Sequence, residues 1–202
     1  HYTFSRARDN GQNSQTFTAT QSRINPFDPT FDNVAPSPND IPHRFVVSAV
    51  WQPGVPSGLQ DSAVGRALFR GWTLAPIFVA QSGNVYTANV TGTCGGISGG
   101  FTCSGGPARN LALARNSFRQ PRIVNLDMRL SRRFHIKESM NFELLGEAFN
   151  VFNRFQVTGI NFTQYAFSGN NLNFVPAFGS VFSAGNSIYR ERQVQLAARF
   201  EF

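Results

Sequence analysis

The chain has 202 residues and a formal net charge of +7, with 14% charged and 41% hydrophobic residues. Soluble domains usually carry about 25% charged residues, so this sequence is charge-poor. The positive charge comes almost entirely from Arg, and the longest basic run is Arg132–Arg133. Without a basic helix or finger, a nucleic-acid partner is not expected. Attraction to an anionic lipid surface and a simple preference for Arg both remain open.

The chain begins at His1, and no apolar run approaches the roughly 20 residues that a membrane helix needs. The sequence is therefore expected to be the inside of a longer precursor or a processed product of one.

Six stretches are expected to be strands, because apolar and polar residues alternate along most of them. They are residues 1–10, 43–52, 71–86, 122–135, 141–152 and 190–202. In the second stretch, one face holds Phe45, Val47, Ala49 and Trp51. Pro76 in the third stretch lacks a backbone N–H, so a bulge or another local irregularity is expected there.

The connections between these stretches alternate in length. Residues 11–42, 87–121 and 153–189 form three long connections without expected secondary structure, and residues 53–70 and 136–140 form shorter ones. Long loops at one edge and short turns at the other are typical of an outer-membrane barrel. The sequence thus predicts one all-β domain over 1–202, an antiparallel sheet of about six long strands that is part of a membrane-type β-barrel. A soluble β-sandwich is the alternative, because it shares the alternation.

The fourth and fifth strands allow a register to be predicted. If His135 lies opposite Asn141, Arg133 faces Glu143 and Arg129 faces Glu147, while apolar residues meet on the other face. A slip of one residue would place charges against apolar groups. The two charge pairs, Arg129 with Glu147 and Arg133 with Glu143, are therefore expected on a polar, lumen-facing side.

The two cysteines, Cys94 and Cys103, lie in the glycine-rich segment "CGGISGGFTC". Their spacing fits neither a zinc knuckle nor a redox pair. We predict a loop disulfide, which implies an oxidising compartment. Two buried free thiols are the alternative.

No motif for catalysis, for a metal or for a cofactor is present. His1, His43 and His135 have no ligand spacing, and neither a nucleophile elbow nor a phosphate-binding loop occurs. We therefore expect a protein that is not an enzyme and that needs no cofactor.

Five segments in order carry a family resemblance: "YTFSRARDN", "IPHRFVVSAVW", "GWTLAPIFVAQSGNVYT", "ELLGEAFNVFNRFQ" and "RERQVQLAARFEF". They resemble the C-terminal barrel segments of TonB-dependent outer-membrane receptors, in the Oar-like group with a carboxypeptidase-regulatory-like N-terminal domain. The resemblance covers nearly the whole chain and is weakest in the long loops.

The resemblance implies a 22-stranded barrel with an N-terminal plug and a TonB box upstream of these residues. It also implies a bacterial outer-membrane or cell-surface location, and extracellular positions for the three long loops and both cysteines. In this family the assembly machinery reads a last strand that ends on an aromatic residue. The matching positions are Val194, Leu196, Ala198, Phe200 and Phe202.

Two functions follow as expectations. The first is the C-terminal barrel portion of a TonB-dependent receptor or transporter, with outer-membrane lipid and the remaining barrel strands as partners. The second is a self-assembling structural fragment, because six strands leave two open edges. Copies of the chain would then pair through their edges into a homo-oligomer, tube or filament.

Overall fold

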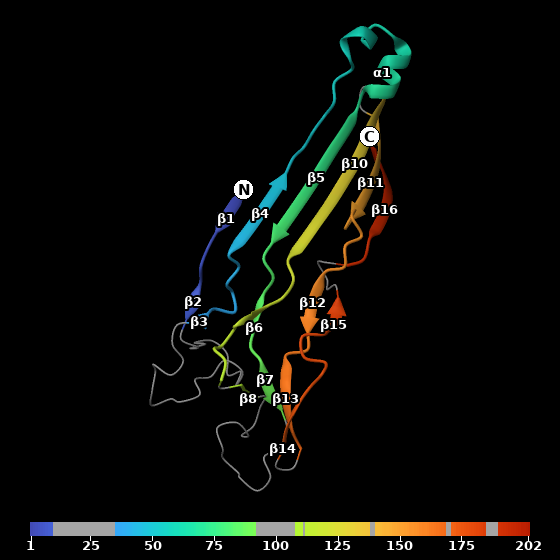
Figure 1. Cartoon of the computed structure of the whole chain (residues 1–202). Helices are drawn as coiled ribbons and strands as arrows, with labels where there is room; N and C mark the ends of the chain where they lie inside the picture. The colour runs from blue at the N-terminus through green and yellow to red at the C-terminus, as the bar shows by residue number, and fades with distance from the viewer. Residues whose placement is uncertain (10–34, 92–107, 111, 138–139, 169–170, 185–189) are drawn as a thin grey trace.

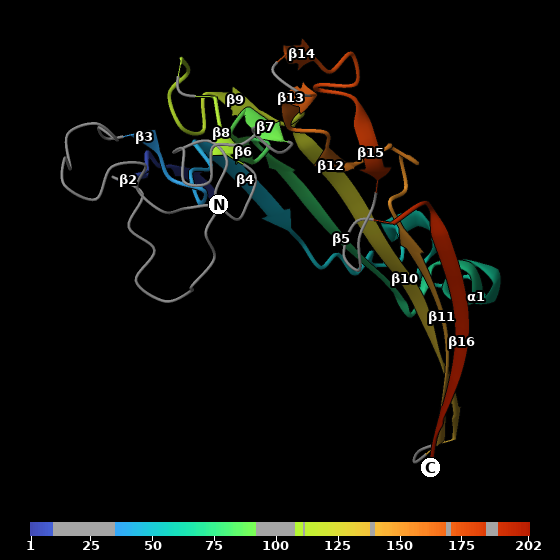
Figure 2. The ribbon, with the colours of Figure 1, turned by 90° about the horizontal axis from the view of Figure 1, so that it is seen from below.

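Six antiparallel strands form one curved sheet in the computed structural model (Figures 1 and 2). The structure describes residues 1–9, 35–91, 108–110, 112–137, 140–168, 171–184 and 190–202. The six strands, in their order across the sheet, are β1 (Tyr2–Phe4), β4 (His43–Ser48), β5 (Trp72–Gln81), β10 (Ile123–Lys137), β11 (Met140–Phe149) and β16 (Gln193–Glu201). Each lies within or overlaps one predicted stretch, so the predicted all-β class is confirmed.

The register of the β10–β11 hairpin is the predicted one. His135 lies opposite Asn141, and Arg133 and Arg129 lie opposite Glu143 and Glu147. The pairing shifts only next to the turn, between His135 and Lys137. The pattern of charges along two neighbouring strands was therefore sufficient to set the pairing.

Pro76 causes no bulge, but it does cause the local irregularity that was the other expectation. Pairing between β5 and β10 continues without a shift through Pro76, which lies opposite Met128. The missing N–H affects the other neighbour instead, because β4 ends at Ser48, opposite Ile77. Beyond this gap, Ala49 still donates to the Pro76 carbonyl and Trp51 bridges to Leu74 in the same register. Proline has thus removed a ladder donor without adding a residue.

Short strands occur in the long connections and at the ends of the first and third predicted stretches, which corrects the expectation of structureless loops. Two of the small strand pairs are β2 (Arg8–Asp9) with β3 (Ala35–Pro36) and β6 (Val85–Tyr86) with β9 (Phe118–Arg119). A third pair joins β12 (Val157–Ile160) to β15 (Val181–Ala184). A further sheet has the order β14 (Asn171–Phe174), β13 (Thr163–Ser168), β7 (Asn89–Thr91) and β8 (Ala108–Arg109).

These small strands all lie at one end of the main sheet (Figure 1). At the opposite end, the connection from β4 to β5 contains a 3-10 helix, η2 (Ser57–Leu59), and a helix, α1 (Ala63–Phe69). The Ser62 side chain caps α1 by accepting a hydrogen bond from the Gly65 amide. The sequence pattern does not indicate this helix. The C-terminus lies at the same end as α1 (Figure 1).

Buried apolar residues are few. Among the described residues they are Ala35, Ala88, Val90, Ile123 and Ile160. Most of them lie in or beside the small strands, and none lies on the apolar face of the main sheet. That face therefore contributes nothing to an internal core, which raises the question of what covers it.

Candidate membrane-facing wall and loop network

One face of the main sheet is almost entirely apolar. We call it the apolar face and define it by the residues that the cross-strand registers place together. From β1 to β16 these are Tyr2 and Phe4; Phe45, Val47 and Trp51; Trp72, Leu74, Pro76, Phe78 and Ala80; Val124, Leu126, Met128, Leu130 and Phe134; Phe142, Leu144, Gly146 and Ala148; and Val194, Leu196, Ala198 and Phe200.

The described part of the chain leaves much of the apolar face uncovered. Leu196 is 84% exposed, Val194 66% and Phe4 61%. Contiguous apolar surface of this extent is unstable in water and marks a surface that something else covers. Along β10, the band from Val124 to Phe134 measures about 33 Å, or about 25 Å along a barrel axis at a tilt of about 40°. That height matches the apolar band of outer-membrane barrels.

The predicted assembly-signal residues lie on this face. Val194, Leu196, Ala198 and Phe200 are opposite Ala148, Gly146, Leu144 and Phe142 of β11. Phe202 follows β16 and is 94% exposed. The structure thus groups the first four residues on one surface, while their reading by an assembly machinery stays a prediction.

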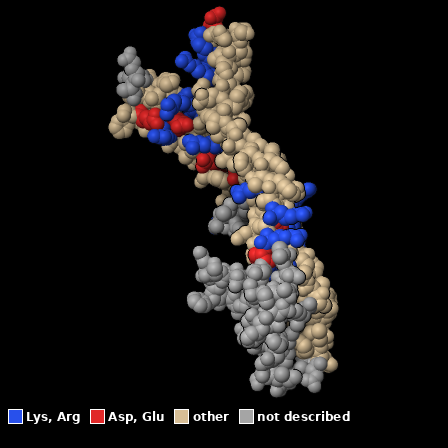
Figure 3. All heavy atoms as spheres, turned by 90° about the vertical axis from the view of Figure 1, so that its left-hand side faces the viewer, with Lys and Arg blue, Asp and Glu red and all other residues tan. Residues whose placement is uncertain are grey.

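The opposite face of the sheet is polar along β10, β11 and β16. Figure 3 shows charged side chains along one edge of the upper part of the molecule, beside a broad surface of uncharged residues. A hollow of about 540 Å³ lies against the polar face, and Arg129, Arg133, His135 and Glu143 are among its lining residues. This face provides the surface that a water-filled lumen requires.

The predicted charge pairs keep their register but do not form the predicted ion pairs. Arg133 pairs with Glu201 at 3.0 Å rather than with Glu143, and Arg199 pairs with the same carboxylate at 3.1 Å. Glu147 accepts a hydrogen bond of 2.7 Å from Gln195, and in the described part of the chain Arg129 makes no ion pair. The prediction considered one hairpin only. In the sheet β16 brings further polar partners to these side chains.

Asn150 forms a polar corner just after β11. Its side chain is 3% exposed and its φ of 50° is left-handed, a conformation that Asn tolerates better than most residues. Its backbone N–H donates to the side-chain carboxylate of Asp127 of β10 at 2.9 Å. Its side-chain Nδ2 donates to the carbonyls of Arg154 and Arg190, and Oδ1 accepts from the Arg154 amide. One residue therefore joins β10, the turn after β11 and the segment that enters β16.

Gln156 hydrogen-bonds to the edge of β10 where that strand extends beyond its pairing with β11. Its side-chain amide donates to the Val124 carbonyl and accepts from the Val124 N–H. Val124 lies beyond the last β10–β11 pair, Met128 with Ala148. The Gln156 amide therefore takes the place of a strand partner, and at 2% exposure it is among the most buried polar residues.

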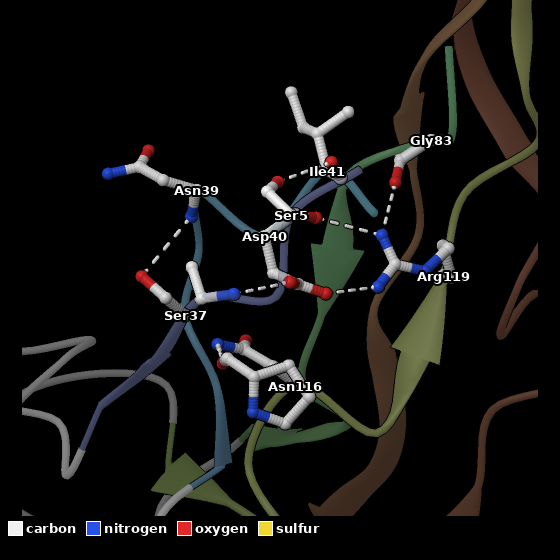
Figure 4. Close-up of polar contacts among 10 residues, drawn as sticks. Ser5, Ser37, Asn39, Asp40, Ile41, Gly83, Asn116 and Arg119 are labelled. Carbon is white, nitrogen blue, oxygen red and sulfur yellow. Dashed lines mark hydrogen bonds and ion pairs between the residues drawn. The ribbon is translucent and has the colours of Figure 1, made fainter. Parts of the chain in front are cut away.

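Asp40 and Arg119 join the first two long connections (Figure 4). Arg119 Nη2 lies 2.6 Å from Asp40 Oδ2, and Nη1 donates to the carbonyls of Asp40 and Gly83. The Ala7 amide donates to Asp40 Oδ1 at 2.8 Å. Burial raises the pKa of the Asp40 carboxyl, but the Ala7 amide, Arg119 and Arg6 together hold that pKa below its usual value of 3.8.

Further contacts tie the loop strands together. Arg115, which is 4% exposed, forms an ion pair with Asp9. Asn116 exchanges hydrogen bonds with the Thr87 hydroxyl and donates to the Pro36 carbonyl. Asn110 donates to Gln164 at 2.7 Å, which links the second and third long connections.

An aromatic cluster adds a second link between these two connections. The ring centroids of Tyr86 and Phe118 are 5.4 Å apart, and Phe178 lies edge-on to Phe118 at 5.3 Å. Burial raises the pKa of the Tyr86 hydroxyl. The three long connections therefore form one network at their end of the sheet. No sequence motif indicated it.

Other expected features are separate or outside the described residues. Cys94 and Cys103 lie outside them, so the predicted disulfide stays a prediction. His1 precedes β1, His43 lies in β4 and His135 lies in β10, and the described residues hold no group of three or more metal-ligating side chains. None of the described helices has the length and apolarity needed to cross a membrane.

A single curved sheet with an uncovered apolar face and a polar opposite face defines the wall of a membrane β-barrel. The soluble sandwich requires a second sheet packed on the apolar face, and the described residues place none there. A family model described as an outer membrane beta barrel domain matches residues 1–109 and 101–195. The chain belongs to this family and to the bacterial outer membrane. No curated protein and no solved structure matches it.

Proposed function

We propose that this chain forms the C-terminal part of the barrel of a TonB-dependent outer-membrane receptor that imports a nutrient. The proposal includes no catalytic step. It is supported by the resemblance of five ordered segments to that group and by membership in an outer-membrane barrel family. It is carried by β16, an edge strand whose apolar residues alternate, with Phe200 at its short-turn end and Phe202 directly after it.

In this role the two faces of the sheet have different tasks. The apolar face contacts lipid, and the polar face with Arg129, Glu143 and Glu147 lines the lumen around a plug supplied by another part of the receptor. The three long connections lie outside the cell and form the outer rim. Their mutual hydrogen bonds hold that rim together, so substrate contacts there involve a preformed surface.

Binding to TonB tests the receptor proposal. The complete gene product, solubilised from outer membranes in detergent, is mixed with the purified periplasmic domain of TonB. We expect a complex that is lost when the TonB box upstream of these residues is deleted. A properly inserted barrel that does not bind TonB would contradict the receptor function while leaving its outer-membrane location intact.

A structural role through the open edges is the second candidate. The observation that favours it is that β1 and β16 form the two edges of the main sheet, each with one side unpaired in the described part of the chain. Such edges can pair with copies of the chain in water or in lipid. In a tube or filament, β16 of one copy lies beside β1 of the next.

Cross-linking between copies separates the two candidates. Thr3→Cys and Gln193→Cys place one thiol on each edge strand, in a background with Cys94→Ser and Cys103→Ser. A flexible bismaleimide then gives a ladder of multimers if copies pair edge to edge. A receptor barrel gives a single species, because its edge strands pair with other strands of the same barrel.

A further inference from the structure

Arg132 is an exception on the apolar face. It lies in the centre of the sheet on β10, opposite Trp72 of β5 and Leu144 of β11. Among the described positions of this face, Arg132 and His43 are the only basic side chains, and no acidic one occurs there. Its neighbours along the strand on the same face are Leu130 and Phe134.

Two aromatic rings hold the Arg132 guanidinium. Its central carbon lies 5.0 Å from the centre of the Trp72 ring and 4.6 Å from that of Phe134. These distances are within the range of cation–π attraction. The Trp72 indole is itself fixed, because its N–H donates to the Leu68 carbonyl of α1 at 2.8 Å. The position of the guanidinium is therefore defined by the sheet and by the helix.

The charge of Arg132 has no anionic partner in the described part of the chain. Its Nε is buried without a hydrogen-bond partner, and no carboxylate forms an ion pair with it. The next residue, Arg133, points to the polar face and pairs with Glu201. An unpaired cation at a lipid-facing surface is costly, so a partner from the lipid phase is favoured.

The depth of Arg132 indicates which part of a lipid it meets. Two residue steps separate it from Phe134 at the end of the apolar band, about 5 Å along the barrel axis. This end carries the short connections and α1, whose Val64 and Leu68 are 65% and 57% exposed. Short turns mark the periplasmic side of outer-membrane barrels. Arg132 therefore lies about 5 Å inside the periplasmic end of the apolar band, a depth from which the long Arg side chain can extend to the phosphates of the periplasmic headgroups.

We propose that Arg132 and Trp72 form a binding site for the phosphate of a glycerophospholipid in the periplasmic leaflet. A guanidinium presents a planar fork of donors that matches two phosphate oxygens, and the two rings preset its plane. The acyl chains then lie along Leu130, Leu74 and Leu144 of the apolar face. The proposal depends on the outer-membrane location and not on the receptor function, so it can fail or succeed separately.

Native mass spectrometry of the complete gene product in detergent tests the site, with dioleoyl phosphatidylglycerol as the probe. Dioleoylglycerol, which has the same acyl chains without the phosphate, is the control lipid. For the wild-type protein we expect saturable binding of the phospholipid and at least about tenfold weaker binding of the control lipid. Equal binding of the two lipids would overturn the proposal without any variant.

The variants locate the site. Arg132→Gln is expected to weaken phospholipid binding about tenfold, and Arg132→Lys to weaken it less, because the charge stays while the planar fork is lost. Arg129→Gln is the matched control, since it removes the same charge from the same strand on the polar face and should bind like the wild type. The heat-sensitive gel mobility of folded barrels verifies that each variant is folded. Wild-type affinity in folded Arg132→Gln would contradict the assignment.

Discussion

Asp40 is a buried carboxylate whose negative charge is stabilised by its contacts. The Ala7 amide and Arg119 bind the charged form, which is why its pKa in the folded protein lies below 3.8. A group whose folded pKa is depressed adds stability above its unfolded pKa and loses it as the pH falls through the folded pKa. The contribution of Asp40 is thus complete near neutral pH and disappears below about pH 4.

This linkage can be measured as a thermal midpoint in detergent between pH 7 and pH 3. We expect Asp40→Asn to lower the midpoint at pH 7 and to flatten its fall below about pH 4, because the variant has no carboxylate to protonate. Asp61→Asn, at an exposed position in the turn before α1, is the control and should retain the acid dependence of the wild type. Parallel curves for Asp40→Asn and the wild type would contradict the assigned role.

Asn150 combines a backbone requirement with a hydrogen-bond requirement, and two substitutions separate them. Asn150→Ala loses three side-chain hydrogen bonds and leaves at φ 50° a residue that tolerates this conformation less well than Asn, so we expect a loss of about 2–4 kcal/mol. Asn150→Gly loses the same hydrogen bonds but tolerates the conformation, so its loss should be smaller by about 1 kcal/mol. Denaturant unfolding in detergent measures both. Equal losses would show that the backbone conformation contributes nothing.

At the scale of single residues, the sequence alone could not have revealed these sites. Asp40 and Arg119 are 79 positions apart, and Arg115 and Asp9 are 106 apart. No periodic pattern connects residues at such separations. The outcome for Arg133 has a similar origin, since its carboxylate partner lies on β16 and not on the neighbouring strand β11. Only the assembled sheet brings those two side chains within reach.

At the scale of elements, the strands were predictable because apolar and polar residues alternate along them. This period of two indicates a β-strand whose two faces lie in different environments. The β10–β11 register followed from matching charge with charge and apolar with apolar across two strands. The helix α1 was missed although Ser62 precedes good helix formers, because its seven residues are too few to show a helical period. The short strands of the long connections were missed for the same reason of length.

Strand β16 provides a prediction about orientation. Leu196 lies on the apolar face opposite Gly146, and the next residue, Ala197, lies on the polar face opposite Leu145. An Arg on the lipid side near the middle of the bilayer costs about 2–4 kcal/mol, whereas one in a lumen costs little. We therefore expect Leu196→Arg to reduce the amount of folded protein in the outer membrane several-fold and Ala197→Arg to leave it nearly unchanged.

Quantitative immunoblots of outer-membrane fractions check this comparison, with heat-sensitive gel mobility as the measure of folding. The two variants carry the same charge in the same strand, so a general effect of Arg on export would lower both. A larger loss for Ala197→Arg than for Leu196→Arg would reverse the assignment of the two faces.

At the scale of the whole molecule, the exposed apolar surface and the small number of buried apolar residues have one explanation. Free energy that a soluble domain gains from an internal core is gained here by contact with lipid, while the polar face stays hydrated. The loop network at one end and the short connections at the other give the wall its direction across the membrane. The alternation of apolar and polar residues along the strands therefore accounts for the two different faces, for the distribution of charge and for the fit of the sheet to the outer membrane.

Site-directed spin labelling along β10 tests this account most directly. Single cysteines replace residues 125–131, one at a time, in the complete gene product with Cys94→Ser and Cys103→Ser, reconstituted in phospholipid bilayers. Collisions of each nitroxide with oxygen, which concentrates in lipid, are compared with collisions with a water-soluble nickel complex. The account predicts a period of two, with oxygen favoured at Leu126, Met128 and Leu130 and nickel favoured at positions 125, 127, 129 and 131. The opposite phase, or no alternation, would contradict a wall that has one face in lipid and one in water.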